Sequence, residues 1–470
     1  MFRLILEITL DNINNFDKIP LENIKVLSII IPKDNKQYFM YRRQLEQLKE
    51  WRNSSTRKPL IIRGARQVGK SYLISQFGRE FQNYIEINFE KDITAKNYFA
   101  GDLDIEKIMR LLSIYKEKKI IPGETLIFLD EIQECENALK ALRYFKEERP
   151  DIHVIAAGSL LDFTIEKIGM PVGRVQFLYL YPISFTEFLQ ISNREDLLEY
   201  ITKQENEPSI HEIILGYLKD YLLIGGMPAV INSWIQEKDY ITCQEIQDEI
   251  IESYQQDFYK YAKKNQIEYL TRVFDNIPSQ LGNKFKYVNI DREVRSIYFK
   301  EALSLLNRAG IINICYHTSA KSQPLGSMID DRKFKVYLFD VGIAQRILGL
   351  DLKQYLLSPI TVNNVGKIIE QFVAQELVIN SNLKANRKAS LYYWHRESKN
   401  SNAEVDFLIL KNNKIVPVEV KSGKVGRMKS LYIYLEENKN TEHGLKISEG
   451  MFAENDNIIE IPLYAIKNIF

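Results

Sequence analysis

The sequence predicts an α/β fold with a parallel sheet, because short apolar runs alternate with helical patterns over its first half. The runs have the composition of buried strands and lie at 60–62, 84–90, 125–133, 153–161 and 177–185. Helical patterns separate all but the last two of these runs. Alternation of this kind indicates βαβ units, whose strands are parallel. We therefore expect one parallel sheet with helices on both faces.

The first apolar run leads into a glycine-bounded loop within KPLIIRGARQVGKS, residues 58–71. The loop fits G-x-x-x-x-G-K-[ST] between a strand and a helix, and consists of Gly64, Ala65, Arg66, Gln67, Val68, Gly69, Lys70 and Ser71. Inward-pointing N–H groups and the start of the helix can hold phosphate oxygens. We expect Lys70 to contact the β- and γ-phosphates of ATP and Ser71 to bind Mg²⁺.

Two carboxylates, Asp130 and Glu131, follow the apolar run that begins at Thr125. The carboxyl end of a buried parallel strand is where an α/β sheet places its ligand chemistry. We expect Asp130 to hold the Mg²⁺ shell and Glu131 to orient the attacking water. Acids that end a strand are often only solvated, but the phosphate loop requires the same ion, so the two motifs support each other.

Two polar residues near later strands each have two interpretations. Ser159 follows the run that starts at His153, where it could sense the γ-phosphate, but serine is also a favoured helix N-cap. Arg174 lies in a glycine-flanked loop. It could stabilise transition-state charge in its own chain or in a neighbouring subunit, which would require an oligomer. The alternative for Arg174 is an ordinary surface arginine.

The composition is that of an ordinary globular chain of several domains. Lys and Arg total 63 against 62 Asp and Glu, so no overall basic field attracts nucleic acid and any such contact must be local. The cysteines Cys135, Cys243 and Cys315 are too widely spaced for a disulfide framework or a zinc motif. The sequence has no apolar run of about 18 residues, and Glu7 interrupts the apolar N-terminus. We expect a cytoplasmic protein with no membrane segment.

The last part of the chain carries a second group of candidate residues. Strand-like runs joined by the turn KNNK present Asp406 on the first strand, and Glu419 with Lys421 on one face of the second. Carboxylates from adjacent strands of a hairpin can converge on Mg²⁺, and the lysine can activate water. Glu370 and Glu376 lie six residues apart in a preceding helical pattern and point to different sides of that helix, so we expect at most one of them to face the site.

This arrangement resembles the PD-(D/E)xK nuclease core, although Val405 stands where that core has proline. Asp406, Glu419 and Lys421 would then be catalytic, with Glu370, Asp406 and Glu419 as metal ligands. The alternative is that these carboxylates are solvated edges of a structural domain.

Several motifs together resemble a widespread prokaryotic family of AAA-type (AAA+) ATPases with a C-terminal domain of unknown function. They are RGARQVGKS, LIFLDEIQ, AAGSLLDF, GRVQFLYLYPISFTEFL, YLLIGGMPAVI, IEQFVAQEL and EVDFLIL with PVEVKSG. The resemblance covers roughly residues 37–470. It implies an ATP-binding AAA+ core with a helical lid. The family's functional residues correspond to Lys70, Ser71, Asp130 and Glu131 and, by their positions in the sequence, to Ser159 and Arg174. It does not imply nuclease activity for every member.

The expected organisation has five parts. They are an N-terminal extension at 1–35, the ATPase core at 36–183, the lid at 184–266, a winged-helix-like domain at 267–340 and a nuclease-like domain at 341–470. In the winged-helix segment we expect Asn289 to begin one helix and Gly310 to end the next. Basic residues outnumber acids over 284–321, which fits DNA contact, although winged helices also serve as protein-contact modules.

The sequence therefore predicts an ATPase that uses Mg²⁺ and drives or gates a C-terminal module. One alternative is an ATP-gated, Mg²⁺-dependent nuclease acting on DNA. Another is a nucleotide switch whose C-terminal domain only binds a partner.

Overall fold

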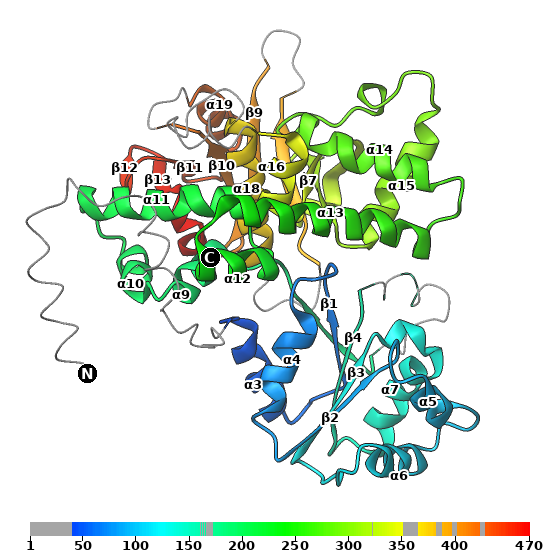
Figure 1. Cartoon of the computed structure of the whole chain (residues 1–470). Coiled ribbons are helices and arrows are strands. Elements are labelled where there is room, and N and C mark those ends of the chain that lie inside the picture. The colour runs from blue at the N-terminus through cyan, green and yellow to red at the C-terminus, as the bar shows by residue number, and fades with distance from the viewer. Residues whose placement is uncertain are drawn as a thin grey trace, which may run out of the picture. The chain divides into compact units, whose positions relative to one another are not determined.

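The computed structural model describes residues 40–159, 161, 163, 165, 173–321, 323–350, 365–381, 388–396, 402–423 and 428–470. The N-terminal extension predicted at 1–35 lies outside these residues. Figure 1 shows the elements of the described ranges with the labels used below.

The predicted parallel sheet is present, with strand order β2-β3-β4-β1-β5 among the described residues. Its strands are β1 (Leu60–Arg63), β2 (Asn83–Asn88), β3 (Thr125–Asp130), β4 (His153–Ala157) and β5 (Gln176–Tyr179). Every neighbouring pair is parallel, so all carboxyl ends lie at one edge. β3 is buried along its whole length, as a strand covered on both faces should be.

Helices cover both faces of this sheet, as predicted. They are α3 (Gln44–Asn53), α4 (Lys70–Gly78), α5 (Ile93–Lys96), α6 (Ile105–Tyr115) and α7 (Glu136–Glu148). Side chains of a strand alternate between the two faces. Accordingly, Leu60 and Ile62 of β1 belong to the hydrophobic core that includes α3 and α4, whereas Ile61 belongs to the core of α6 and α7.

The segment after β5 is helical, as its pattern predicts. It contains α9 (Phe185–Ile191), α10 (Glu195–Lys203), α11 (Pro208–Ile224), α12 (Pro228–Glu237) and α13 (Tyr240–Tyr261). Ser184 and Glu187 form a capping box at the start of α9. Gly225, at a φ of 73°, makes the turn between α11 and α12. Of the helices described, none combines the length and the apolar composition needed to cross a membrane.

The next segment contains α14 (Ile267–Asn276), α15 (Ser296–Arg308), β6 (Ile312–Thr318), β7 (Ile329–Leu338) and α16 (Val341–Leu348). The prediction that Asn289 begins a helix is wrong, because a single 3₁₀ turn ends at Asn289. The Asp291 carboxylate accepts the Glu293 N–H at 2.8 Å, a local turn that competes with helix formation. Gly310 follows α15 with a φ of 74°, as predicted for a helix stop.

A second sheet unites strands from the predicted winged-helix and nuclease-like segments. The remaining elements are α18 (Val365–Ser381), β8 (Leu391–His395), β9 (Glu404–Lys411), β10 (Lys414–Val420), α19 (Lys429–Glu437), β11 (Gly444–Ser448), β12 (Ala453–Asn455) and β13 (Ile458–Pro462). Within the described ranges the order is β12-β13-β11-β10-β9-β8-β6-β7. The β9–β10 hairpin is antiparallel, and β6 pairs in parallel with β8. The boundary predicted at 340/341 therefore divides one sheet, and the division into two domains stays a prediction.

A buried carboxylate joins α18 to the start of α9. Glu376 is 2% exposed, and its Oε1 accepts the Phe185 N–H at 2.9 Å. Asn380 donates to the other carboxylate oxygen at 3.1 Å. Burial raises the pKa of Glu376 from its usual 4.5 to about 7, against the opposing effect of the Phe185 N–H. The fold therefore favours the protonated form of this group.

We expect Glu376→Gln to stabilise the protein more at high pH than at low pH. The burial penalty of the ionised carboxylate is absent below the unfolded-chain pKa, develops as the pH rises, and is complete above about pH 7. Glutamine keeps an acceptor for Phe185 but cannot ionise. The free energy of unfolding of the variant, relative to wild type, should rise by about 1 kcal/mol or more between about pH 5 and pH 8.

Denaturant titrations at both pH values measure this difference. Glu199→Gln, on the exposed face of α10, is the matched control and should give a difference that hardly changes with pH. A pH-independent difference for Glu376→Gln would contradict the assignment.

Candidate functional site

The loop between β1 and α4 has backbone geometry that few sequences tolerate. Gly69 has a φ of 93° and Gln67 a φ of 64°, both in the left-handed region. At Gly64, a Cβ atom would lie 2.2 Å from the carbonyl oxygen of Leu180. Glycine is therefore required at Gly64 by the close approach of the loop to the chain after β5.

The ammonium of Lys70 lies inside this loop. It donates hydrogen bonds to the carbonyl oxygens of Gly64 at 3.0 Å and Ala65 at 2.8 Å. Lys70 is 7% exposed, and burial lowers its pKa to about 8, although the charges of Glu131 and Asp130 act in the opposite direction. A cation held on neutral acceptors is well placed to transfer to an anion that enters the loop.

Asp130 is the polar centre of the neighbouring strand ends. Its Oδ2 accepts from Ser71 Oγ at 2.9 Å and from Asn88 Nδ2 at 3.1 Å, while its Oδ1 accepts the Glu131 N–H at 3.0 Å. Burial raises the pKa of Asp130. Asn88 was not predicted as a site residue, although it ends β2 in direct register with Asp130.

Glu131 has an unusual backbone conformation, with a φ of 47°. Its Oε2 accepts from Gln133 Nε2 at 2.5 Å. A Cβ atom at Gly158 would lie 2.0 Å from Gln133 Oε1, so Gln133 packs directly on the carboxyl end of β4. Gln133 therefore orients Glu131. The residue belongs to the motif LIFLDEIQ, but no role was predicted for it.

The donor set of Ser71 and Asp130 fits a magnesium ion that arrives with a nucleotide. Mg²⁺ commonly takes one or two protein oxygens and completes its shell with phosphate and water. Across the part of the chain that the structure describes, no group of three or more His, Cys, Asp or Glu side chains could hold a metal by itself.

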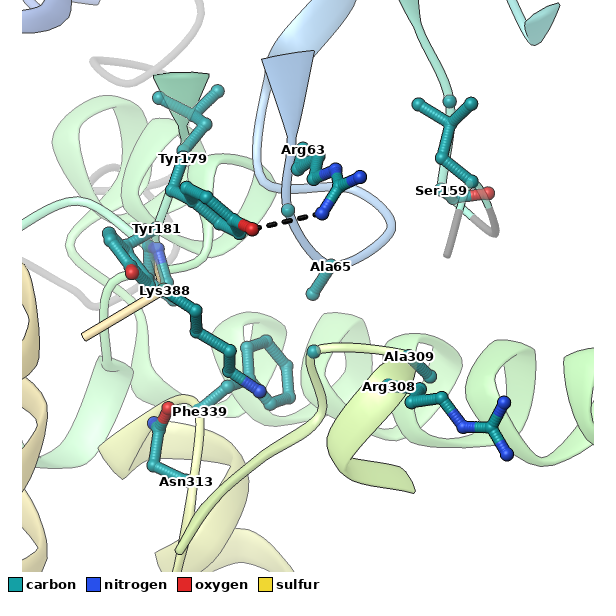
Figure 2. Close-up of a pocket in the computed structure, with 16 residues that line it drawn as sticks. Arg63, Ala65, Ser159, Tyr179, Tyr181, Arg308, Ala309, Asn313, Phe339 and Lys388 are labelled. Atoms are coloured by element: carbon teal, nitrogen blue, oxygen red, sulfur yellow. Dashed lines mark hydrogen bonds between the residues drawn. The ribbon is translucent and has the colours of Figure 1, made fainter. Parts of the chain in front are cut away.

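Ser159 lies beside two hollows that flank the loop. Figure 2 shows the first, with Ser159, Ala65 and Arg308 around it and the 3.0 Å hydrogen bond from Arg63 to Tyr179. The second is lined by groups that include Arg66, Glu131, Ser159, Lys260, Lys263 and Arg308. Ser159 is thus near the loop. Whether it also caps a helix depends partly on residues outside the described ranges.

Helices of the predicted lid touch the phosphate loop directly. Arg66 forms an ion pair with Asp257 of α13 at 2.5 Å, and Gln67 donates to Ser253 of the same helix at 3.0 Å. The hydroxyl of Tyr254, also on α13, donates to the Arg66 carbonyl. Three direct contacts therefore join the loop to α13.

Arg174 lies at the surface, away from the loop of its own chain. Its side chain is 48% exposed, and Nε is 3.1 Å from Glu147 of α7. It lines neither hollow described above. A catalytic role for Arg174, in its own chain or in a neighbouring subunit, stays a prediction.

The second predicted constellation surrounds a lysine that was not predicted as a site residue. Lys335 of β7 is fully buried, and its Nζ is 3.0 Å from Glu370, 2.7 Å from Glu404 and 3.6 Å from Asp406. Tyr337 donates its hydroxyl hydrogen to the same Glu370 oxygen at 2.5 Å. The structure thus brings the predicted Glu370 and Asp406 together around an ammonium.

Glu419 and Lys421 complete this cluster. Lys421 Nζ is 2.6 Å from Glu419 Oε1, as their positions on one strand face predict. Asp406 Oδ2 accepts the Val420 N–H at 2.8 Å. Burial raises the pKa of both Asp406 and Glu419.

These side chains do not fit a magnesium ion. The ammonium lies among the oxygens of Glu370, Glu404 and Asp406, where a metal would need contacts of about 2.1 Å. Within the described ranges, the acidic side chains of this cluster do not form a group of three that could hold a metal ion. Glu404 lies two residues before Asp406 on the same strand and could have been predicted from the sequence. The approach of Lys335 could not, because it depends on the pairing of strands that lie far apart in the sequence.

No curated protein matches this sequence. Solved structures with some likeness include the Walker-type ATPase PABY2304 of Pyrococcus abyssi, at 14% identity and a TM-score of 0.45, covering 68% of this chain and 99% of that one. Another is Orc1 of Aeropyrum pernix in complex with DNA, at 12% identity and a TM-score of 0.29, covering 67% of this chain and 93% of that one. Such distant likeness carries no functional inference.

Three family models match successive segments of the chain. An AAA domain matches residues 56–189, and domains of unknown function match 215–354 (DUF8612) and 365–466 (DUF4143). Neither of the last two names a winged helix or a nuclease. Together, the AAA match, the parallel sheet and the phosphate loop support an AAA-type P-loop ATPase in the first half of the chain.

Proposed function

We propose that this chain hydrolyses ATP with Mg²⁺ at the phosphate loop and that turnover controls the helices and the second sheet that follow. One observation carries the proposal: Ser71 Oγ lies 2.9 Å from Asp130 Oδ2, which unites the loop with the adjacent strand end. A Mg²⁺ ion bound with ATP would neutralise negative charge on the β- and γ-phosphates.

Each residue of the site has a separate role. Backbone N–H groups of Gly64–Gly69 and the start of α4 hold phosphate oxygens, and Lys70 compensates the charge that develops on them. Ser71 and Asp130 hold the ion. Glu131, oriented by Gln133, positions the attacking water. Ser159 senses the γ-phosphate, and Arg174 serves a neighbouring subunit.

Control of the later helices rests on the contacts between the loop and α13. Phosphate would draw Lys70 away from the Gly64 and Ala65 carbonyls, which would shift the loop that holds Arg66. Arg66 is paired with Asp257 of α13. At a further point on α13, Asp248 forms a 2.6 Å ion pair with Arg346 of α16. These contacts support a path from the nucleotide to α16, the helix that follows β7 of the second sheet.

An ATP-gated nuclease is the second candidate, because Asp406, Glu419 and Lys421 do lie together. The buried ammonium of Lys335 weighs against Mg²⁺-dependent cleavage by this cluster. The geometry therefore favours a C-terminal module that responds to the ATPase by changing its contacts with a partner.

DNA is one partner that the surface of α15 suits. Arg292, Arg295 and Lys300 are exposed around the start of this helix, and Tyr298 is 40% exposed beside them. Exposed cations can contact phosphates, and an exposed aromatic ring can stack on a base. We propose that this end of α15 contacts DNA.

We expect Lys70→Ala and Glu131→Gln each to lower kcat for phosphate release from ATP by roughly 10²-fold or more, because each removes a transition-state contact. Glu131→Gln should still bind ATP. Glu134→Gln, which alters another acid of the same hollow, is the matched control and should keep near-wild-type turnover. Unchanged phosphate release in Glu131→Gln would refute the assignment of the water-orienting residue.

We expect ATP to bind about tenfold more weakly at about pH 9 than at about pH 7. The pKa of Lys70 is lowered to about 8, so its ammonium loses a proton in this range in the nucleotide-free protein. Fluorescent ATP analogues measure the affinity. Lys70→Arg, which keeps its charge throughout, should remove most of the pH dependence. If the ATP affinity of Lys70→Arg fell equally steeply with pH, the pH dependence would belong to another group.

We expect the double charge reversal Arg292→Glu with Arg295→Glu to weaken duplex DNA binding by roughly tenfold or more and to reduce the slope of log affinity against log salt by about two. Fluorescence anisotropy at several salt concentrations measures both. Lys107→Glu with Lys140→Glu reverses two exposed charges on α6 and α7 and should leave binding unchanged. Equal losses of DNA affinity in both double variants would show a nonspecific charge effect.

A further inference from the structure

We propose that Lys335 is a built-in cation that takes the place of a divalent metal in the carboxylate cluster and fastens β7 to α18 and β9. The proposal concerns the second sheet alone and does not depend on ATP hydrolysis. Its starting point is the position of the Lys335 ammonium among Glu370, Glu404 and Asp406.

The ammonium matches what this cluster requires. Lysine has three N–H donors; the oxygens of Glu404 and Glu370 lie within hydrogen-bond distance of Nζ, at 2.7 and 3.0 Å, and the Asp406 oxygen lies at ion-pair distance, 3.6 Å. Burial lowers the pKa of Lys335, but the surrounding carboxylates outweigh that effect and raise it well above its usual value. The group therefore stays charged and offsets the negative charge of its neighbours.

The Lys335 side chain is buried, although its Glu404 partner is 35% exposed. The side chain of Lys335 has no exposed surface, and its Nζ lies 5.4 Å from the centre of the Tyr393 ring. Cys315, on the adjacent strand β6 in register with Lys335, is also fully buried. A metal ion bound among all three carboxylates would have to displace the ammonium toward these neighbours, and an unpaired buried charge is strongly unfavourable.

The carboxylates would repel one another without this cation. Glu370 comes from α18, Glu404 and Asp406 from β9, and Lys335 from β7. β7 ends the sheet order of the described strands, where it pairs with β6. The ion pairs therefore add a charged clamp between this last strand and elements that follow it in the chain.

The first test is Mn²⁺ binding to the nucleotide-free, full-length protein, followed by electron paramagnetic resonance. We expect wild type and Asp406→Asn to bind the same amount of Mn²⁺, because the cluster takes none. Asp130→Asn reports any weak binding at the phosphate loop. A bound Mn²⁺ that is retained in Asp130→Asn but lost in Asp406→Asn would overturn the proposal.

The second test removes the cation. We expect Lys335→Met to lower the unfolding temperature by roughly 5–15 °C, since it removes the cation that offsets the charge of three closely spaced carboxylates. Mn²⁺ should then raise the unfolding temperature of Lys335→Met but not that of wild type, and adding Asp406→Asn should abolish the response.

Lys446→Met is the matched control. Lys446 also lies in the second sheet, where it pairs with Glu460 at 2.8 Å outside the cluster. This variant should lose stability without gaining a response to Mn²⁺. An unfolding temperature of Lys335→Met that equals wild type would overturn the proposal, and if Lys335→Met does not fold, the Mn²⁺ measurement on wild type decides.

Discussion

The position of β1 between β4 and β5 is the constraint on which the nucleotide site depends. Because β1 pairs in parallel with both strands, the loop after Arg63 emerges at the edge where the other strands also end. The closeness of Gly64 to the Leu180 carbonyl follows from the same pairing. So does the short path from Asp130 to Ser71, since β3 lies one strand beyond β4. The sheet, rather than the loop sequence alone, sets the distances of the site.

Two buried lysines illustrate how the partners of an ammonium decide its role. Lys70 rests on the neutral carbonyls of Gly64 and Ala65, which an entering anion can replace without leaving any charge unpaired. Lys335 rests on carboxylates, which hold it by charge and which would be left unpaired if it moved. The contacts of Lys70 can therefore be exchanged for contacts with a ligand, whereas the contacts of Lys335 are suited to be permanent. Both lysines are nearly or fully inaccessible to solvent, so burial alone does not separate a binding residue from a structural one.

Local patterns predicted the local structure well. The apolar runs, the glycine-bounded loop and the helix stop at Gly310 depend on neighbouring residues. Each strand begins within one residue of its run, but β4 and β5 end at Ala157 and Tyr179, before their runs do. The prediction that a helix begins at Asn289 was wrong, because a turn made by the Asp291 side chain competes with the helix. The pairing of β6 with β8, the approach of Lys335 to Glu370 and the contact of Gln133 with Gly158 were not predicted, because each joins segments that no local periodicity connects. The P-loop residues could be named from the sequence, but their supporting residues, Asn88 and Gln133, could not be ranked without the strand register.

The strand order of the second sheet bears on how such a chain can be rearranged by recombination. The segments that match separate families, 215–354 and 365–466, share one sheet through β6 and β8. Cutting between them would expose the edge of β8 and would leave Lys335 buried without its carboxylates. Although sequence families divide the chain there, a recombination event at that point would separate two halves of one folding unit. The two segments are therefore expected to be inherited as a pair, while the AAA domain can diverge or be exchanged with fewer broken strand pairings.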